Sequence, residues 1–182
     1  TRAYNRRIIN QKWNKEMKKT IRNISCLLLV FSLLPLLSGC NNEDDIIEIL
    51  TGKTWKLTYI NLKDKGGWMN GFSEKSIKIL SENQESYTIT FTGTEEDNRI
   101  SNGAVKGKII TADLTGTWSA NGKNNEFHAS VTNVNENDDL AKEFIKGLNN
   151  ASSYIGDDNG LFLYYNPAGS QQTYVLAFHV QR

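Results

Sequence analysis

The chain has 182 residues, of which 38% are apolar and 23% are charged, with 21 Lys and Arg side chains against 20 Asp and Glu. This composition excludes a collagen-like chain, a disulfide-rich scaffold and a compositionally disordered chain, and the length allows one domain or two small ones. The formal charge of +1 hides an uneven distribution: residues 1–39 hold 8 basic residues and 1 acidic residue, so residues 40–182 carry a charge of −6. An acidic body argues against nucleic acid as a partner.

The first 39 residues are expected to direct export. From Met17 the chain reads Met-Lys-Lys-Thr-Ile-Arg-Asn, and an apolar run follows at residues 26–37. A basic start, an apolar stretch of about a dozen residues and small residues before a cleavage site are typical of a secretory signal peptide. The run is shorter than the ~20 residues of a membrane span. We assign residues 17–39 to a signal peptide and residues 1–16 to a non-native upstream extension; a basic nucleic-acid-binding arm is the alternative for the latter.

Cys40 ends the segment Leu37-Ser38-Gly39-Cys40. This segment resembles the lipobox of bacterial lipoproteins, in which the Cys is diacylated through its sulfur and becomes the first residue of the mature chain. Two acyl chains anchor a protein stably because each buried CH₂ contributes about 0.8 kcal/mol. The resemblance implies that the membrane is a partner, reached through acyl chains on Cys40. Cys26 would leave with the signal peptide, so the mature chain could form no internal disulfide.

Residues 40–49 are interpreted as an acidic tether. Asn41 and Asn42 follow Cys40, and three acidic residues come next at positions 43–45. An Asn beside the lipidated Cys resembles lipoproteins sorted to the outer membrane, and the acidic triplet is similar to the export tags of surface lipoproteins in Bacteroides-type bacteria. The resemblance implies an outer-membrane location and leaves open whether the domain faces the periplasm or the cell surface.

Residues 50–182 are expected to form a single domain dominated by β-strands. Asn-Gly pairs begin at positions 70, 102, 121 and 159 and favour tight type I′ turns between antiparallel strands. Gly107 is expected to mark a bulge or bend. Apolar residues alternate with polar ones in six segments, whose inward faces are predicted as Trp55, Leu57 and Tyr59; Tyr87, Ile89 and Phe91; Val105 and Ile109; Phe127, Ala129 and Val131; Leu161, Leu163 and Tyr165; and Tyr174, Leu176, Phe178 and Val180. Such alternation predicts an antiparallel sheet with one buried face.

The segment Asp138–Leu148 has a helical period instead. Leu140, Phe144, Ile145 and Leu148 recur at helical spacing, acidic residues occupy the first turn, and Asn137 is the expected N-cap. The predicted fold is therefore mainly β (α+β), a curled antiparallel sheet or partial barrel with one packed helix. Whether the sheet closes into a barrel is left open.

Motifs along the domain resemble a known family. They are Gly52-x-x-Trp55, Asp139-Leu140, Glu143-Phe144, Leu148, Tyr154, Asp157-Asp158, Leu161-Phe162-Leu163-Tyr164 and Val175-Leu176-Ala177-Phe178. Together they are similar to the META domain, a small envelope or secreted domain that also occurs in lipoproteins of unknown function from Bacteroides. The resemblance implies a META-like β domain over residues 50–182. The chain lacks the Gly-Cys-Asn segment of the commonest META pattern, which argues against a Cys-dependent role.

A second resemblance points to ligand transport. Gly116-Thr117-Trp118 is similar to the Gly-x-Trp motif of lipocalins, whose barrels hold apolar ligands, although that motif opens the first strand in lipocalins. This resemblance implies a lipocalin-like carrier of a small apolar ligand as the alternative function.

Side chains that could perform chemistry are few. His128 and His179 lie on the outward faces of predicted strands without a ligand pattern beside them. The pairs Asp138/Asp139 and Asp157/Asp158 have structural roles at a helix start and before a turn. The serine-hydrolase, phosphate-loop and dinucleotide motifs are missing from the sequence. We therefore expect a protein that is not an enzyme, with no metal site and no cofactor.

The candidate binding loop is the glycine-rich segment around Trp68. Trp68 and Met69 follow two glycines and precede Asn-Gly and Phe72. An aromatic side chain on such a loop can anchor a partner, and the alternative is a lid on the core. The sequence thus favours a lipid-anchored envelope domain with a non-enzymatic binding or structural role, whose partner is an envelope protein or a small ligand.

Overall fold

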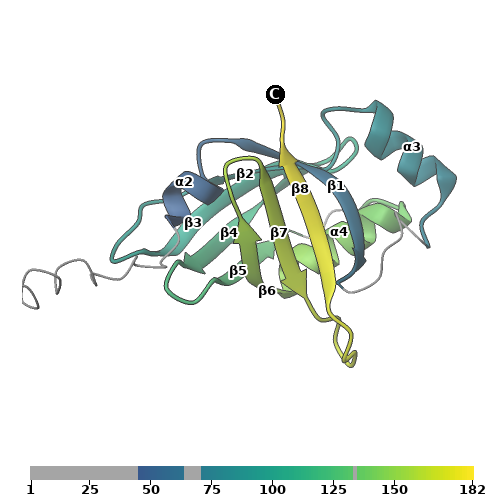
Figure 1. Cartoon of the computed structure of the whole chain (residues 1–182). Helices are drawn as coiled ribbons and strands as arrows, with labels where there is room; N and C mark the ends of the chain where they lie inside the picture. The colour runs from purple at the N-terminus through teal and green to yellow at the C-terminus, as the bar shows by residue number, and fades with distance from the viewer. Residues whose placement is uncertain (1–44, 64–70, 133–134) are drawn as a thin grey trace, which may run out of the picture. The chain divides into compact units, whose positions relative to one another are not determined.

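The computed structural model describes residues 45–63, 71–132 and 135–182, whose strands follow one another around a closed barrel (Figure 1). Each strand pairs antiparallel with the next, and β1 pairs with β8 to close the circle. The strands are β1 Thr54–Leu62, β2 Thr88–Thr92, β3 Arg99–Lys108, β4 Asp113–Asn121, β5 Glu126–Val131, β6 Ala151–Gly156, β7 Gly160–Tyr165 and β8 Tyr174–Val180. The helices are α2 Ile46–Leu50, α3 Glu74–Glu82 and α4 Asp139–Asn150. The prediction of a mainly β fold with a packed helix is confirmed, and the sheet closes.

Helix α4 compensates for the weakest junction of the barrel. Strands β5 and β6 share one register pair, Glu126 with Ser153, and α4 packs against β5, β7 and β8. Its buried side chains include Leu140, Phe144 and Leu148, which enter the core at the helical spacing that the sequence predicts. Gly147 allows the close approach, because a Cβ atom there would lie 2.9 Å from a methyl carbon of Leu176.

The turn that leads into β3 uses Asp-Asn rather than Asn-Gly. Asp97 and Asn98 have φ angles of 53° and 56°, and Glu96 and Arg99 exchange two backbone hydrogen bonds across them. Two positive φ angles define a type I′ turn, and Asp and Asn tolerate that conformation well. The prediction of a turn at Asn102-Gly103 is wrong, because this pair lies inside β3.

Two glycines inside β3 leave room for atoms that a Cβ atom would exclude. A Cβ atom on Gly103 would lie 2.1 Å from Nε1 of Trp118, so the glycine makes room for the indole ring. Gly107 stays in register with Ile89 rather than forming the expected bulge. A Cβ atom on Gly107 would lie 2.1 Å from the carbonyl oxygen of Thr88, so the missing side chain permits close approach of β2.

A register shift in β1 changes which residues face the core. The pairing of β1 with β8 shifts between Leu57 and Tyr59. Trp55, Leu57 and Ile60 are therefore buried, whereas Tyr59 faces outward and is only partly buried. The expectation that Tyr59 lies in the core is wrong, because a bulge inverts the alternation beyond it.

Two helices were not predicted, and their N-caps explain where they begin. Asp45 caps α2, and Ser73 caps α3. Residues 46–49, assigned to the tether, belong to α2, whose Ile46 and Leu50 are fully buried. Helix α4 is capped by Asp138 rather than by Asn137, since the Asp138 carboxylate accepts a hydrogen bond from the Ala141 amide.

The described elements all belong to one compact unit, residues 42–182. Its core is built from its own strands and helices, so the unit has what an independently folding domain needs. Within the described ranges, no helix is long and apolar enough to cross a membrane.

Candidate functional site

The residues predicted to carry function lie mostly outside the described ranges. Cys40, Trp68 and Met69 fall there, so their predicted roles stay predictions. Phe72 is described: it is partly buried and packs against the core just before Ser73.

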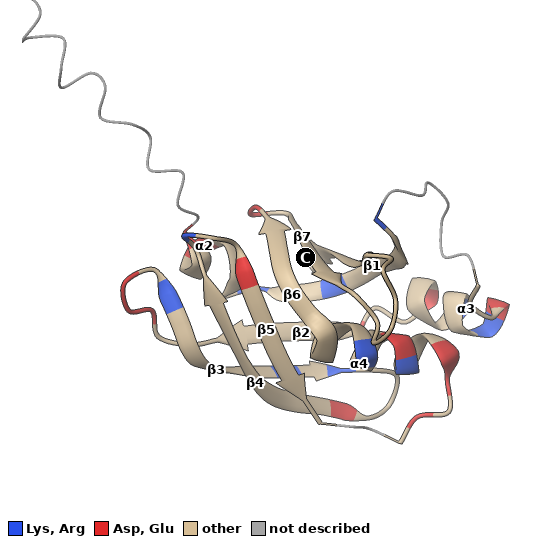
Figure 2. Ribbon diagram, turned by 90° about the horizontal axis from the view of Figure 1, so that it is seen from below, with Lys and Arg blue, Asp and Glu red and all other residues tan. Residues whose placement is uncertain are grey.

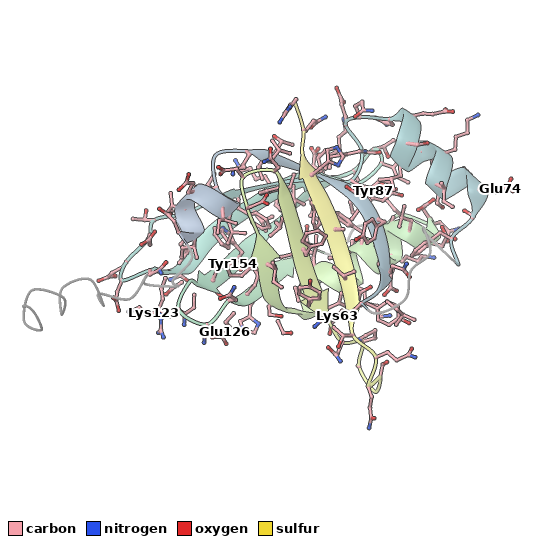
Figure 3. The ribbon with its side chains drawn as sticks, in the orientation of Figure 1. Lys63, Glu74, Tyr87, Lys123, Glu126 and Tyr154 are labelled. Carbon is pink, nitrogen blue, oxygen red and sulfur yellow. The ribbon has the colours of Figure 1, made fainter. Side chains whose placement is uncertain are left out.

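A polar cluster joins the N-termini of α3 and α4. The Ser76 hydroxyl lies 2.6 Å from Oδ2 of Asp138 and also contacts Oδ1 of Asp139. The Ser73 amide donates to Oδ2 of Asp139 at 2.8 Å. Tyr87, labelled in Figure 3, donates its hydroxyl to Oδ1 of Asp138 at 2.8 Å. The cluster therefore fastens α3 to α4 and to the start of β2.

The pKa values of this cluster fit a structural role. The hydrogen bond from Ser76 lowers the pKa of Asp139, and the amide of Ser73 adds to that effect. Burial raises the pKa of the Tyr87 hydroxyl, and its hydrogen bond to Asp138 raises it further. A charged Asp139 and a protonated Tyr87 are the states that hold this network together.

Lys56 is the second buried polar group that the sequence analysis missed. Alternation with Trp55 and Leu57 would place Lys56 outward on β1, yet it is only 3% exposed because the connection from α3 to β2 covers it. Its ammonium donates to the Asn83 carbonyl at 2.8 Å, to the Ser86 hydroxyl at 3.2 Å and to the Ser86 carbonyl. Burial lowers the pKa of Lys56 to about 8. Through these hydrogen bonds Lys56 fastens the connection between α3 and β2 to strand β1.

Aromatic side chains fill the described interior of the barrel. Phe91 lies 4.9 Å from Trp118 and 5.6 Å from Phe127 between ring centroids. At the other end, Phe144 of α4 lies 5.7 Å from Tyr87. These five side chains are at most 2% exposed. The interior is thus packed with side chains that would otherwise line a ligand cavity.

The outer surface of the barrel has two unlike halves. On β2 to β5 most outward positions are polar, among them Thr90, Thr92, Lys106, Thr115, Thr117, Ser119, His128 and Ser130. Strands β6, β7 and β8 contain no Lys, Arg, Asp or Glu, and β6 and β7 are drawn without charged residues in Figure 2. Because strands alternate, solvent-facing positions on a barrel are usually polar, so the second half departs from the expected pattern.

Two rows of outward side chains cross this second half, and we call them together the aromatic face. One row runs from β6 to β1 and the other lies beside it; in order, they are Ile155, Phe162, Ala177 and Tyr59, and Ser153, Tyr164, Val175 and Asn61. Ile155 is 55% exposed and is the large apolar side chain most exposed among the described residues. Ala177 and Val175 are at most 6% exposed, whereas Phe162 and Tyr164 are half-buried.

Lys63 borders the aromatic face at the end of β1. Its ammonium lies 5.0 Å from the ring centroid of Tyr164, a cation–π contact, and Figure 3 labels it near the lower end of β8. Burial raises the pKa of Tyr164, and the nearby Tyr59 adds to that effect. The two tyrosines therefore lie close enough to interact across β8.

The histidines lie on the outer surface, as predicted. His128 Nε2 is 3.1 Å from Oε1 of Glu126, which lowers the pKa of that carboxyl group. His179 Nδ1 is 2.8 Å from the Thr58 hydroxyl, and burial lowers the pKa of His179. Across the described ranges, no three or more His, Cys, Asp or Glu side chains are grouped so that they could hold a metal ion.

Two hollows in the surface are open and polar. One, of about 180 Å³, lies on the polar half beside Arg99 and His128. The other, of about 730 Å³, lies beside α4 and is lined by residues that include Glu136 and Lys146. The Glu136 carboxylate accepts hydrogen bonds from three successive backbone amides, those of residues 110–112, at 3.1 to 3.3 Å. Glu136 therefore fastens the chain before α4 to the β3–β4 turn.

The fold and its surface define a closed, eight-stranded, up-and-down β-barrel domain with a helix beside the junction of β5 and β6. The chain belongs to a family described as a domain of unknown function, DUF4847, which matches residues 41–180. A crystal structure of a DUF4847 family protein from Bacteroides vulgatus ATCC 8482 is similar to it, with 27% identity and a TM-score of 0.50. The similarity covers 74% of this chain and 96% of that one. No curated protein matches the chain.

Proposed function

We propose that this chain is a lipid-anchored envelope lipoprotein whose barrel has a non-enzymatic binding or structural role at the outer membrane. The aromatic face is the observation that carries the binding role. Removing apolar side chains from water is favourable, so an outer strand surface with an exposed Ile155 and half-buried Phe162 and Tyr164 is a candidate interaction site. The packed interior supports binding through the outer surface.

The anchor rests on the lipobox resemblance at Cys40. Five residues separate Cys40 from Ile46 at the start of α2. Such a segment spans at most about 18 Å when fully extended. A lipidated Cys40 would therefore keep the barrel near the membrane surface, where its partners would meet it.

The anchor is tested by replacing the acylated sulfur. Cys40→Ser should abolish incorporation of labelled palmitate and release the protein from membranes, whereas Cys26→Ser, inside the apolar run, should leave both unchanged. Continued membrane attachment of the Cys40→Ser protein would refute the anchor. Sucrose-gradient fractionation followed by protease treatment of intact cells would test the outer-membrane location and distinguish surface exposure from a periplasmic orientation.

A lipocalin-like carrier is the second candidate, favoured by the order of the strands. An eight-stranded up-and-down barrel is the architecture that lipocalins use for small apolar ligands. The packing of Phe91, Trp118 and Phe127 argues against it. Titration with an apolar fluorescent probe tests this alternative: saturable binding that Phe127→Ala strengthens would support it, and unsaturable binding would refute it.

The META resemblance also belongs to this proposal. The matched motifs map onto β1, α4, β6, β7 and β8. If the resemblance reflects common ancestry, a META domain superposed on this barrel should place its helix at the junction of β5 and β6. A different helix position would refute the relationship.

A further inference from the structure

We propose that residues 73–86, which we call the α3 flap, open from the closed barrel as one unit, and that Lys56 takes up a proton from water as they open. This inference concerns the barrel alone and does not depend on the anchor. The first support is the small apolar surface that α3 buries. Its nine residues bury two side chains, the polar Ser76 and the apolar Leu80, whereas α4 buries six of its residues. In Figures 1 and 2, α3 lies at the periphery of the domain next to α4.

Hydrogen bonds fasten both ends of the flap. At its start, the Ser73 amide donates to the Asp139 carboxylate at 2.8 Å. At its end, the buried Lys56 ammonium donates to the Asn83 carbonyl at 2.8 Å and to the Ser86 hydroxyl at 3.2 Å. Water replaces such hydrogen bonds when a segment opens, so the net stability that they provide is modest. Segments with few buried apolar contacts are the ones that open locally while the rest of a protein stays folded.

Residues with positive φ angles flank the flap. Gly71 precedes it with a φ of 101°, and Tyr87 follows it with a φ of 52°. Glycine adopts this conformation readily, whereas a bulky residue such as Tyr87 is strained there. Opening the flap would relax the backbone at Tyr87. Because a nine-residue helix is too short to be stable alone in water, α3 would unfold as it leaves the barrel, and Leu80 would become exposed.

The burial of Lys56 couples the opening to pH. In the closed barrel its pKa is lowered to about 8, whereas an ammonium that reaches water regains the usual value of 10.5. The open state therefore binds the proton more tightly, so opening becomes rarer as the pH rises through this range. For these two values, the open fraction should fall about eightfold between pH 7.5 and pH 9.

The other groups that face Lys56 keep their charge states between these pH values. His179, its register partner on β8, has a lowered pKa and is neutral. Tyr87, whose ring centroid lies 6.0 Å from the ammonium, has a raised pKa and is protonated. Glu85 of the flap and Lys108 of β3 form an ion pair at 3.1 Å, and carboxylate and ammonium groups ordinarily stay charged in this range. The eightfold change can thus be assigned to Lys56.

Hydrogen exchange measured by mass spectrometry tests the flap. Relative to unstructured peptides, amides of α3 should exchange faster than amides of β3 and β4 by roughly tenfold or more. Their exchange should also depend less steeply on urea, because opening the flap exposes less surface than unfolding the barrel. The open fraction that α3 reports should fall about eightfold from pH 7.5 to pH 9 in the parent and in Lys106→Met, the exposed control on β3, but not in Lys56→Met.

A substitution in the barrel separates flap opening from global unfolding. Ile100→Val removes a methyl group from the core side of β3 and should speed the exchange of the most protected β3 and β4 amides about fivefold. The exchange of α3 should stay unchanged, because the core around Ile100 remains intact when the flap opens. If α3 exchanges as slowly as β3 and β4, or if Ile100→Val speeds all three equally, the flap does not open separately and the inference is overturned. An eightfold change that persists in Lys56→Met would overturn the role of Lys56.

Discussion

The burial of Lys56 predicts that the protein becomes more stable as the pH rises above neutrality. Its folded-state pKa of about 8 lies below the usual value of 10.5. Between these values the unfolded chain binds the proton more tightly than the folded one, so unfolding becomes less favourable as pH increases. For these two pKa values, the free energy of unfolding gains about 2 kcal/mol between about pH 7.5 and 9.5.

The groups around Lys56 define the useful pH window. His179 on β8 is its register partner, and the Tyr87 ring centroid lies 6.0 Å from its ammonium. The pKa of His179 is lowered, so this side chain is neutral in both states above about pH 7.5. The pKa values of Tyr87 and Tyr165 are raised by burial, so their contribution to stability is lost as pH rises above about 10. Measurements between these limits isolate Lys56.

Urea unfolding at both ends of this window measures the effect. The parent protein should gain about 2 kcal/mol, whereas Lys56→Met should show little of this gain because it has no ammonium to neutralise. Lys106→Met, at an exposed position on β3, is the matched control and should gain stability like the parent. If Lys56→Met and the parent gain equally, the reasoning is refuted. No gain in the parent would mean that the three oxygen acceptors keep Lys56 charged.

Two further substitutions test the packing and the polar cluster. Gly103→Ala should destabilise the protein by about 1–3 kcal/mol in thermal unfolding, because the new methyl group collides with Trp118. The control is Gly160→Ala, which should change the stability little because no neighbour would lie nearer than 3.8 Å to the new Cβ atom. A loss of stability as large for Gly160→Ala would contradict this explanation. Asp138→Ala removes the α4 cap and should cost about 1–2 kcal/mol. It should also lower the pKa of Tyr87 in a spectrophotometric titration, and an unchanged phenol would contradict the assigned hydrogen bond.

The alternation of apolar and polar residues predicts most of the strands. It does not predict correctly, for every strand, which residues face the core. The two-residue period places Ile89, Phe91, Leu161 and Leu163 in the core correctly. It fails in β1, where one bulge turns Tyr59 outward. A pattern read along one strand contains no information on a register shift, because the shift is set by the pairing with β8, far away in the sequence.

The polar clusters depend on contacts between distant segments. Lys56 reads as an outward residue, and only the connection that follows α3 buries it. The short helix α2 was not predicted because its residues follow an acidic segment. An Asp at position 45, followed by apolar residues at positions 46 and 50, is nevertheless typical of a capped helical turn.

The aromatic face has a signature in the sequence of β7 and β8. β7 and β8 read Leu161-Phe162-Leu163-Tyr164 and Val175-Leu176-Ala177-Phe178, with apolar or aromatic residues at inward and outward positions alike. A strand that is apolar on both sides is expected to be covered on both sides. By that rule, the sequence alone indicates Phe162 and Tyr164 as candidate residues of a covered outer surface.

The pairing of β1 with β8 also constrains when the protein can finish folding. Before residues 174–180 leave the ribosome, β1 and β7 each present an unpaired edge, and unpaired edges attract other chains. Strand β1 can complete its pairing only after β8 has been synthesised, so the nascent barrel is most prone to aggregation just before β8 emerges. Chaperones that shield strand edges would matter most in that interval.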